Sequence, residues 1–266
     1  MLLVSDVHGA FDDLARVAGT GETLLILGDL INLLDYRTGE GIVSEVMGSE
    51  FGKEAAVRRG EAAFGGIRTM WNAAVAGRVG EVDDLFDAAF ARDYEECRRA
   101  LQGAVGYVTY GNVDRPPLLA LSLPDSMRFV DGEVVEVDGY TVGFAGGGVT
   151  TPLAAQGEVT DDAMAEKLSR LAGVDILCTH VPPDVSPLRT DVITGRAERA
   201  SWPVLDFLNV HQPAFHFFGD VHQPQASTWR IGRTHCRNVG YFRATKRPVR
   251  LMHGVIGGTV QGVPKS

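Results

Sequence analysis

An apolar run passes directly into two potential metal ligands in Leu2-Leu3-Val4-Ser5-Asp6-Val7-His8-Gly9. Its first half has the length and composition of a buried strand, and the polar residues that follow indicate a loop. A carboxylate and an imidazole two positions apart in such a loop can turn toward the same cation. The stretch therefore predicts a strand whose carboxyl end carries metal ligands, Asp6 and His8.

The next thirty residues extend this strand into an α/β unit. Residues Phe11–Val17 have the apolar spacing of a helix, and Thr23–Leu27 reads as a second buried strand that ends at Gly28-Asp29. A strand, a helix and a strand over this length favour a βαβ unit with a parallel pair. Ligands then lie at the carboxyl ends of strands, where open α/β sheets place their sites.

Three later strands are also followed by polar side chains that can bind metals. Taken singly, each such residue has an ordinary structural explanation, such as a helix cap, a turn or a loop histidine. Besides Asp114, the five segments supply three carboxylates, three imidazoles and one carboxamide, which is a ligand set for two adjacent divalent cations. The later segments are Gly111-Asn112-Val113-Asp114 after Val105–Tyr110, Thr179-His180 after Val174–Cys178, and Gly219-Asp220-Val221-His222 after Phe215–Phe218.

The remaining sequence suggests one domain over residues 1–266 with an insertion. Residues 36–104 have apolar side chains at helical spacing and no cluster of ligand-type residues, which predicts a helical insertion. Two interpretations stay open for it, a packing cap on the core and a lid that shapes access to the site.

The second half of the chain is rich in predicted strands. Short alternating runs flank Asp131-Gly132 and Asp138-Gly139, and Asp-Gly between such runs predicts hairpins. Closing strands are expected within Trp229–Val239 and Val249–His253.

Composition narrows the class of protein. The chain has 266 residues, 45% of them hydrophobic, and a formal net charge of -9, which disfavours nucleic acid and anionic membranes as partners. Three separated cysteines make a disulfide framework improbable. No basic region precedes the first apolar run, and no stretch reaches the roughly 20 apolar residues of a membrane span. We expect a cytoplasmic protein that does not enter the membrane.

The order of the five motifs resembles the calcineurin-like metallophosphoesterase family, whose pattern is D-x-H, G-D, G-N-H-[DE], H and G-H-x-H. The resemblance covers nearly the whole chain outside the insertion. It implies an α/β fold, specifically a four-layer αββα sandwich of two mixed sheets with a dinuclear site at one edge. It also implies a hydrolase that cleaves a phosphate ester with metal-activated hydroxide.

The resemblance assigns a role to each motif residue. Asp29 would bridge two divalent cations, with Mn²⁺ favoured and Fe, Mg²⁺ or Zn²⁺ as alternatives. The catalytic group would comprise Asp29, Asn112 and Asp114. The first cation would be held by Asp6, His8 and His222, and the second by Asn112, His180 and Asp220.

Two positions depart from the family pattern. Val113 replaces the histidine that donates a proton to the leaving group, as in a subset composed mostly of small bacterial phosphodiesterases. Asp220 replaces the first histidine of G-H-x-H, which makes the ligand set more anionic and favours harder cations than Zn²⁺.

The first functional hypothesis is therefore a dinuclear phosphoesterase that acts on a small phosphorylated substrate, with diesters favoured. The alternative is a non-catalytic protein-interaction scaffold on the same fold. A nuclease is disfavoured by the acidic composition.

Overall fold

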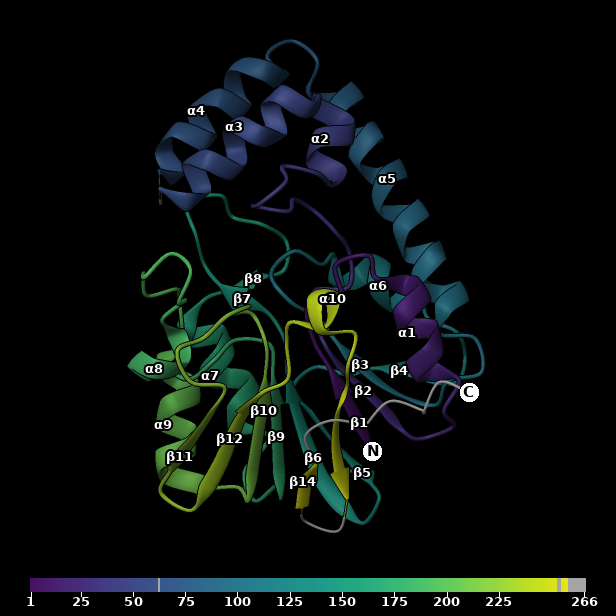
Figure 1. Cartoon of the computed structure of the whole chain (residues 1–266), viewed down its shortest axis with the longest axis vertical. Coiled ribbons are helices and arrows are strands. Elements are labelled where there is room, and N and C mark those ends of the chain that lie inside the picture. The colour runs from purple at the N-terminus through teal and green to yellow at the C-terminus, as the bar shows by residue number, and fades with distance from the viewer. Residues whose placement is uncertain (62, 253–254, 258–266) are drawn as a thin grey trace, which may run out of the picture.

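Two six-stranded mixed sheets form the centre of the molecule (Figure 1). The computed structural model describes residues 1–61, 63–252 and 255–257. In the first sheet, β1, β2, β3 and β4 run parallel, whereas β13 and β14 are antiparallel additions at one edge. Its order is β14 (Val255–Gly257), β13 (Val249–Met252), β1 (Leu2–Val4), β2 (Leu24–Leu27), β3 (Gly106–Thr109) and β4 (Met127–Phe129).

The second sheet has a parallel centre with an antiparallel strand at each edge. A separate pair of short parallel strands, β7 (Gly148–Val149) and β8 (Glu158–Val159), follows β6 in the chain. The sheet order is β11 (Thr228–Ile231), β12 (Thr234–Asn238), β10 (Phe215–Phe218), β9 (Ile176–Thr179), β6 (Tyr140–Ala145) and β5 (Glu133–Val137).

The two sheets pack face to face, and helices cover their outer faces. Leu3 and Leu25 from the first sheet share a buried cluster with Phe144 and Phe217 from the second. Separate apolar clusters lie on the outer faces, one under α1, α5 and α6 and one under α7 and α9. The helices are α1 (Phe11–Ala18), α5 (Val79–Ala100), α6 (Pro116–Ser122), α7 (Asp161–Ser169) and α9 (Trp202–His211). The predicted four-layer α/β architecture is confirmed.

The described part of residues 36–104 forms four helices, and these occupy two different places. Helix α5 packs on α1 and α6 and so belongs to the outer layer of the first sheet. The helices α2 (Ile42–Met47), α3 (Ser49–Gly60) and α4 (Phe64–Val75) stand beyond the edge where β1 and β2 end (Figure 1). The insertion therefore combines a packing element with a group of helices that faces the strand ends.

One of the two predicted hairpins is wrong. Asp138-Gly139 does connect β5 and β6 as an antiparallel pair. At Asp131-Gly132, however, the chain passes from β4 in the first sheet to β5 in the second. Asp131 fixes this crossing because its carboxylate accepts the Gly146 amide at 3.0 Å and pairs with Lys167 Nζ at 2.9 Å.

The closing strands lie where the sequence predicts them. Residues Thr228–Ile231 and Thr234–Asn238 pair as a closing hairpin, and Val249–Met252 forms a strand as expected. His253, the last residue of that predicted strand, lies outside the described residues. Among the described residues, no helix has the length and apolarity to cross a membrane.

His216 on β10 is a buried histidine whose surroundings determine its protonation state. Its Nε2 lies 2.9 Å from Thr179 Oγ1, which itself donates to the Val181 carbonyl, so Nε2 carries the proton. Its Nδ1 is buried without a hydrogen-bond partner among the described residues. Burial lowers the pKa of His216 to about 3, which keeps the ring neutral in the folded protein.

Acidification is expected to destabilise the protein through His216. Between about pH 3 and 6.5 the unfolded chain binds a proton that the folded chain does not, so stability falls as pH falls, by up to about 1.4 kcal/mol per unit. Urea unfolding between pH 7 and 5 should show a shallower pH slope for His216→Phe than for the wild type. His211→Gln, at an exposed position, is the control, and equal slopes in all three proteins would contradict the expectation.

Candidate metal centre

The five predicted ligand segments meet at one edge of the two sheets. Beyond β1 and β2 the loops run side by side, with Asp6 N donating to Gly28 O at 3.1 Å and His8 N donating to Asp29 O at 3.0 Å. The second sheet joins this edge because Asp220 N donates to both carboxylate oxygens of Asp6, at 3.1 and 3.2 Å. Parallel strand ends from both sheets thus bring together ligands that are distant in sequence.

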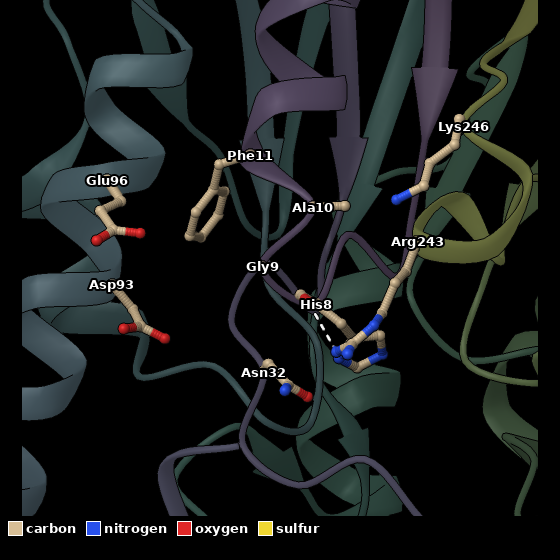
Figure 2. Close-up of a pocket in the computed structure, with 9 residues that line it drawn as sticks. All are labelled: His8, Gly9, Ala10, Phe11, Asn32, Asp93, Glu96, Arg243 and Lys246. Carbon is tan, nitrogen blue, oxygen red and sulfur yellow. Dashed lines mark hydrogen bonds between the residues drawn. The ribbon is translucent and has the colours of Figure 1, made fainter. Parts of the chain in front are cut away.

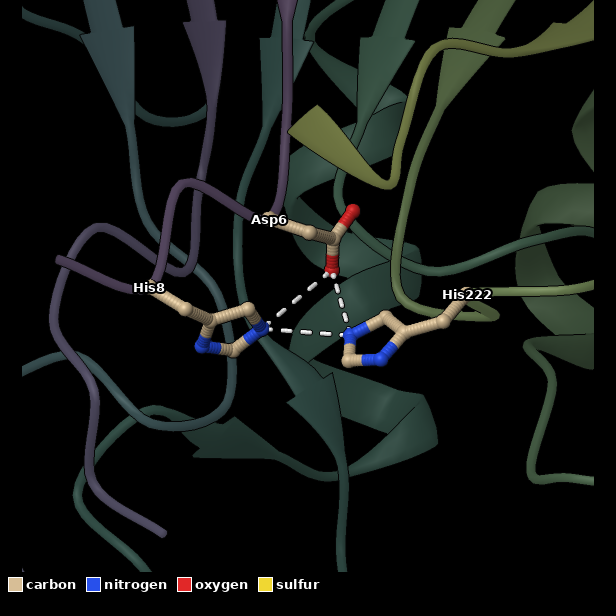
Figure 3. Close-up of side chains that lie close together, drawn as sticks. All are labelled: Asp6, His8 and His222. Carbon is tan, nitrogen blue, oxygen red and sulfur yellow. Dashed lines mark hydrogen bonds and ion pairs between the residues drawn. The ribbon is translucent and has the colours of Figure 1, made fainter. Parts of the chain in front are cut away.

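One group of three side chains comprises Asp6, His8 and His222 (Figure 3). The Nε2 atoms of His8 and His222 are 3.1 Å apart. Asp6 Oδ1 lies 3.9 Å from the first of these nitrogens and 3.5 Å from the second. The three atoms surround one point, which is the arrangement expected around a cation.

A second group lies beside the first and is centred on the buried His180. Its Nε2 is 3.2 Å from Asn112 Oδ1, 3.5 Å from Asp29 Oδ1 and 3.7 Å from Asp220 Oδ1. One imidazole nitrogen and three oxygens suit a cation that prefers oxygen ligands. The structure therefore brings the expected second set of ligands together.

Asp29 lies between the two groups. Its Oδ1 faces His180, as given above, and its Oδ2 is 3.7 Å from Nε2 of His8. The side chain is buried, and Oδ1 also accepts the Val113 amide at 3.1 Å. Two oxygens of one fixed carboxylate thus face two separate candidate cation positions.

Backbone carbonyls orient two of the imidazoles. His8 Nδ1 is 3.1 Å from Ile31 O, and His180 Nδ1 is 2.8 Å from Leu27 O. A carbonyl can only accept, so each Nδ1 carries a proton and each Nε2 faces the site, where it can bind a cation once it is unprotonated. Metal-binding histidines in proteins are commonly held this way.

Four of the candidate ligands have an unusual backbone conformation. Asp6, His8, Asp29 and Asp220 have φ values of 58°, 42°, 55° and 66°. Non-glycine residues with positive φ are uncommon, and such backbone tends to concentrate at functional sites. Contacts with the rest of the fold therefore hold these four residues in a backbone conformation that they would seldom adopt on their own.

Close packing around the ligands also requires glycine. A Cβ added to Gly111 would lie 2.1 Å from Asp29 Oδ1, and one added to Gly219 would lie 2.4 Å from Asp6 Oδ2. Any side chain at either position would displace a ligand carboxylate. The Gly residues that precede Asn112 and Asp220 are therefore part of the site.

Buried charge accumulates at this edge. Burial raises the pKa of Asp220 to about 7, with further increases from Asp29 and Asp6 and an opposing effect of His180. Burial would also lower the pKa of His180, but the Asp29 charge and hydrogen bond raise it well above its usual range. Bound cations would offset this concentration of carboxylates, so the residues fit a metal pair.

Asp114 faces away from the candidate cation positions. Its Oδ2 accepts the amides of Asp29 at 2.8 Å and Gly111 at 2.9 Å, and its Oδ1 accepts the Leu30 amide at 3.1 Å. The hydroxyl of Tyr94 adds a fourth bond at 3.2 Å. Burial raises the pKa of Asp114 to about 7, and the nearby Asp29 charge adds to this shift. Asp114 is thus a positioning residue that fixes the loop bearing Asp29.

Sequence patterns give no signal for the role of Tyr94, which is an aromatic residue at helical spacing in α5. Its hydroxyl also accepts the Arg115 amide at 2.8 Å. The helical insertion therefore contributes directly to the support beneath the candidate metal centre.

A loop near the C-terminal end of the described chain packs against the first ligand group. The ring of Tyr241 stacks on His222 at a centroid distance of 3.9 Å, with planes only 2° apart. Arg243, in the short helix α10 (Phe242–Thr245), donates through Nη1 to the His8 carbonyl at 3.0 Å. These contacts limit how far either imidazole can turn.

A cavity of about 400 Å³ adjoins His8 (Figure 2). Arg243 and Lys246 line one side of it, and Asp93 and Glu96 from α5 line the other. Arg243 is 3.4 Å from Asp35, and Lys246 pairs with Asp13. The basic side chains of Arg243 and Lys246 at the cavity wall are therefore both paired with carboxylates of the protein.

Comparison with known proteins supports the fold and leaves the family open. No protein-family model and no curated protein sequence matches the chain. One solved structure has a TM-score of 0.55 at 14% identity, covering 91% of this chain and 90% of the other. The protein TT1561 of Thermus thermophilus has a TM-score of 0.49 at 13% identity, covering 91% and 89%. The first of these likenesses shows a shared fold alone.

Proposed function

We propose that the chain is a dinuclear metal-dependent phosphoesterase that hydrolyses a small phosphate ester. The observation that carries this proposal is Asp29, whose two oxygens face His8 and His180 in two adjacent ligand groups. Two divalent cations about 3.5–4 Å apart bind phosphoryl oxygens and supply hydroxide at neutral pH when such a site is loaded. The resemblance to the calcineurin-like metallophosphoesterases in motif order supports the same reaction class.

The residues have distinct tasks in this proposal. Asp6, His8 and His222 would hold one cation, and Asn112, His180 and Asp220 would hold the other. Asp29 would fix the spacing between them, and the hydrogen bond that the Asp29 amide donates to Asp114 holds Asp29 in place. Because the backbone presets the ligand directions, little reorganisation is needed when substrate binds.

A diester substrate is favoured by the residue at position 113. Val113 donates its backbone amide to Asp29 Oδ1, but its side chain packs in the apolar cluster of the first sheet and has no proton to donate. General-acid assistance is typically worth about 10²–10⁴-fold in rate. We therefore propose a substrate whose leaving group departs without a proton from this position.

Hydrolysis of bis-p-nitrophenyl phosphate by the Mn²⁺-loaded protein tests the proposal. Turnover is expected with Mn²⁺, is expected to disappear with a chelator, and should exceed turnover of p-nitrophenyl phosphate. Calorimetric titration with Mn²⁺ provides the stoichiometry, expected to be two. A protein that binds Mn²⁺ but turns over neither compound would instead be a scaffold on this fold.

Asp220→His is expected to shift metal preference toward Zn²⁺. Two divalent cations against the carboxylates of Asp6, Asp29 and Asp220 leave a net charge of about +1, and replacing one carboxylate by imidazole raises it to about +2. Imidazole also suits Zn²⁺ better than a carboxylate does. The ratio of Zn²⁺ to Mn²⁺ affinity, measured by competition titration, should rise about tenfold in the variant. Identical ratios in the two proteins would contradict this role for Asp220.

A further inference from the structure

A cluster of aromatic and charged side chains connects the insertion to the loop that precedes α9. The guanidinium carbon of Arg59, near the end of α3, lies 5.2 Å from the ring centroids of both Tyr36 and Phe64. The guanidinium carbon of Arg199 lies 5.5 Å from the Phe64 ring. Arg59 Nη2 is 3.1 Å from Glu198 Oε2, with both side chains 27% exposed. We call these five residues, Tyr36, Arg59, Phe64, Glu198 and Arg199, the roof cluster.

The loop that carries Glu198 and Arg199 is attached to the candidate metal centre. It follows the His180 segment, and Val192 N donates to Gln223 O at 2.9 Å, directly after His222 in the chain. Gln225 N donates to Thr190 O at 2.8 Å. Figure 1 shows the lower ends of α3 and α4 on the side of the molecule where this loop lies. The loop that carries Glu198 and Arg199 is thus hydrogen-bonded to residues that closely follow His222.

The charges of two ligand carboxylates also act on Tyr36 of the roof cluster. Burial raises the pKa of Tyr36, Arg59 opposes the shift, and the negative charges of Asp29 and Asp220 add to it. Tyr36 is nevertheless 47% exposed, so solvent reaches part of the roof cluster.

Arg199 stands beside the strand that supports the second ligand group. It donates through Nη1 to the Thr150 carbonyl at 2.8 Å. Thr150 follows β7, and a Cβ added to Gly148 in that strand would lie 2.2 Å from Asn112 Cβ. Within the described chain, Arg199 bonds to this carbonyl and has no carboxylate partner at ion-pair distance. Its positive charge is thus available to an anion from solution.

The ligand set leaves little net positive charge for binding an anionic substrate, and the roof cluster can add to it. The centre with two divalent cations carries a net charge of only about +1, and the chain as a whole is acidic. Arg59 and Arg199 outnumber Glu198 in the cluster, which gives it a net positive charge. Guanidinium groups packed on aromatic rings are held in place and present their edges to oxygen anions.

We propose that Arg59 and Arg199 bind a second phosphate group of the substrate, beyond the phosphate that lies at the metals. The substrate class is then a phosphodiester that carries a further phosphate group, rather than a compound with a single phosphate. This inference rests on the proposed function for its description of the metal-bound phosphate. It also gives the insertion a role in selecting the substrate, in addition to the packing of α5.

Direct binding to the Mn²⁺-saturated, full-length protein tests the inference. The probes are propyl phosphate and the bisphosphates of 1,3-propanediol and 1,6-hexanediol, which vary the number and spacing of the phosphates. Isothermal titration calorimetry of the wild type should show at least one bisphosphate binding about tenfold or more tightly than the monophosphate. Arg199→Gln and Arg59→Gln should each reduce that preference by about tenfold, and Arg199→Lys should retain part of it.

The control is Arg233→Gln, because Arg233 also donates to a backbone carbonyl, that of Gln212. It directly precedes the first residue of β12, whereas the candidate metal centre lies at the carboxyl ends of strands. This variant should keep the full preference. Equal affinity for mono- and bisphosphates in the wild type would overturn the inference, even if bis-p-nitrophenyl phosphate is hydrolysed. If both arginine variants kept the full bisphosphate preference, the inference would also be overturned, and the roof cluster would have only a structural role. A bisphosphate preference without any diester turnover would instead refute the proposed function and support this anion site.

Discussion

Asp29→Ala is expected to abolish phosphodiester hydrolysis, with kcat/KM falling by at least about 10³-fold. The reason is geometric, because one carboxylate faces both ligand groups and its two oxygens lie 3.7 Å from His8 Nε2 and 3.5 Å from His180 Nε2. Without it, two cations at this edge would lose the ligand that they share and the spacing that it sets. Mn²⁺ titration followed by calorimetry should show weakened binding at both positions.

His222→Ala is the matched comparison for Asp29→Ala. His222 lies within one ligand group only, 3.5 Å from Asp6 Oδ1. We therefore expect it to weaken one Mn²⁺ position while the position around His180 still binds. If Asp29→Ala bound two Mn²⁺ ions with wild-type affinity, the bridging assignment would be wrong, whatever the effect on turnover.

Asp114→Asn is expected to destabilise the protein by about 2–4 kcal/mol and to lower activity by more than about 10²-fold, although the two side chains have nearly the same shape. Both oxygens of Asp114 accept two hydrogen bonds, from Asp29 N, Gly111 N, Leu30 N and the Tyr94 hydroxyl. Either orientation of an amide would place its NH₂ group against two donors. The loop that carries Asp29 would then have to move.

Tyr94→Phe separates the effect of that network from general damage to the core. It removes one bond to Asp114 and the acceptor of the Arg115 amide, but keeps the ring. A loss of about 1–2 kcal/mol is expected in urea unfolding, with a smaller decrease in Mn²⁺ affinity than in Asp114→Asn. Equal stability of Asp114→Asn and wild type would show that the four hydrogen bonds do not hold the loop.

Sequence patterns are most informative where a buried strand ends in a polar residue. Strands such as Leu24–Leu27 are apolar because both faces are covered, and parallel strands align their carboxyl ends at one edge. The meeting of the seven candidate ligands could therefore be predicted from the sequence. The spacing of their atoms and the orientation of each imidazole depend on backbone carbonyls such as Leu27 O, which sequence patterns do not describe.

Other features depend on tertiary contacts that local patterns cannot express. Asp131-Gly132 has the composition of a hairpin, but packing of β4 beside β3 and the pair with Lys167 carry the chain to the other sheet. Tyr94 looks like any core aromatic until its hydroxyl is seen on Asp114. The roof cluster joins Arg59 and Glu198 across 139 positions, far beyond the range of any periodicity.

The left-handed backbone at Asp6, His8, Asp29 and Asp220 restricts which amino acids evolution or an engineer can place there. Aspartate, asparagine and histidine enter this conformation several times more readily than other non-glycine residues. Glutamate offers the same carboxylate but lacks that preference, so Asp→Glu at these positions would oppose the backbone as well as change the reach of the side chain. The backbone conformation thus limits which ligand side chains fit at these positions before any cation binds, and it favours aspartate, asparagine and histidine.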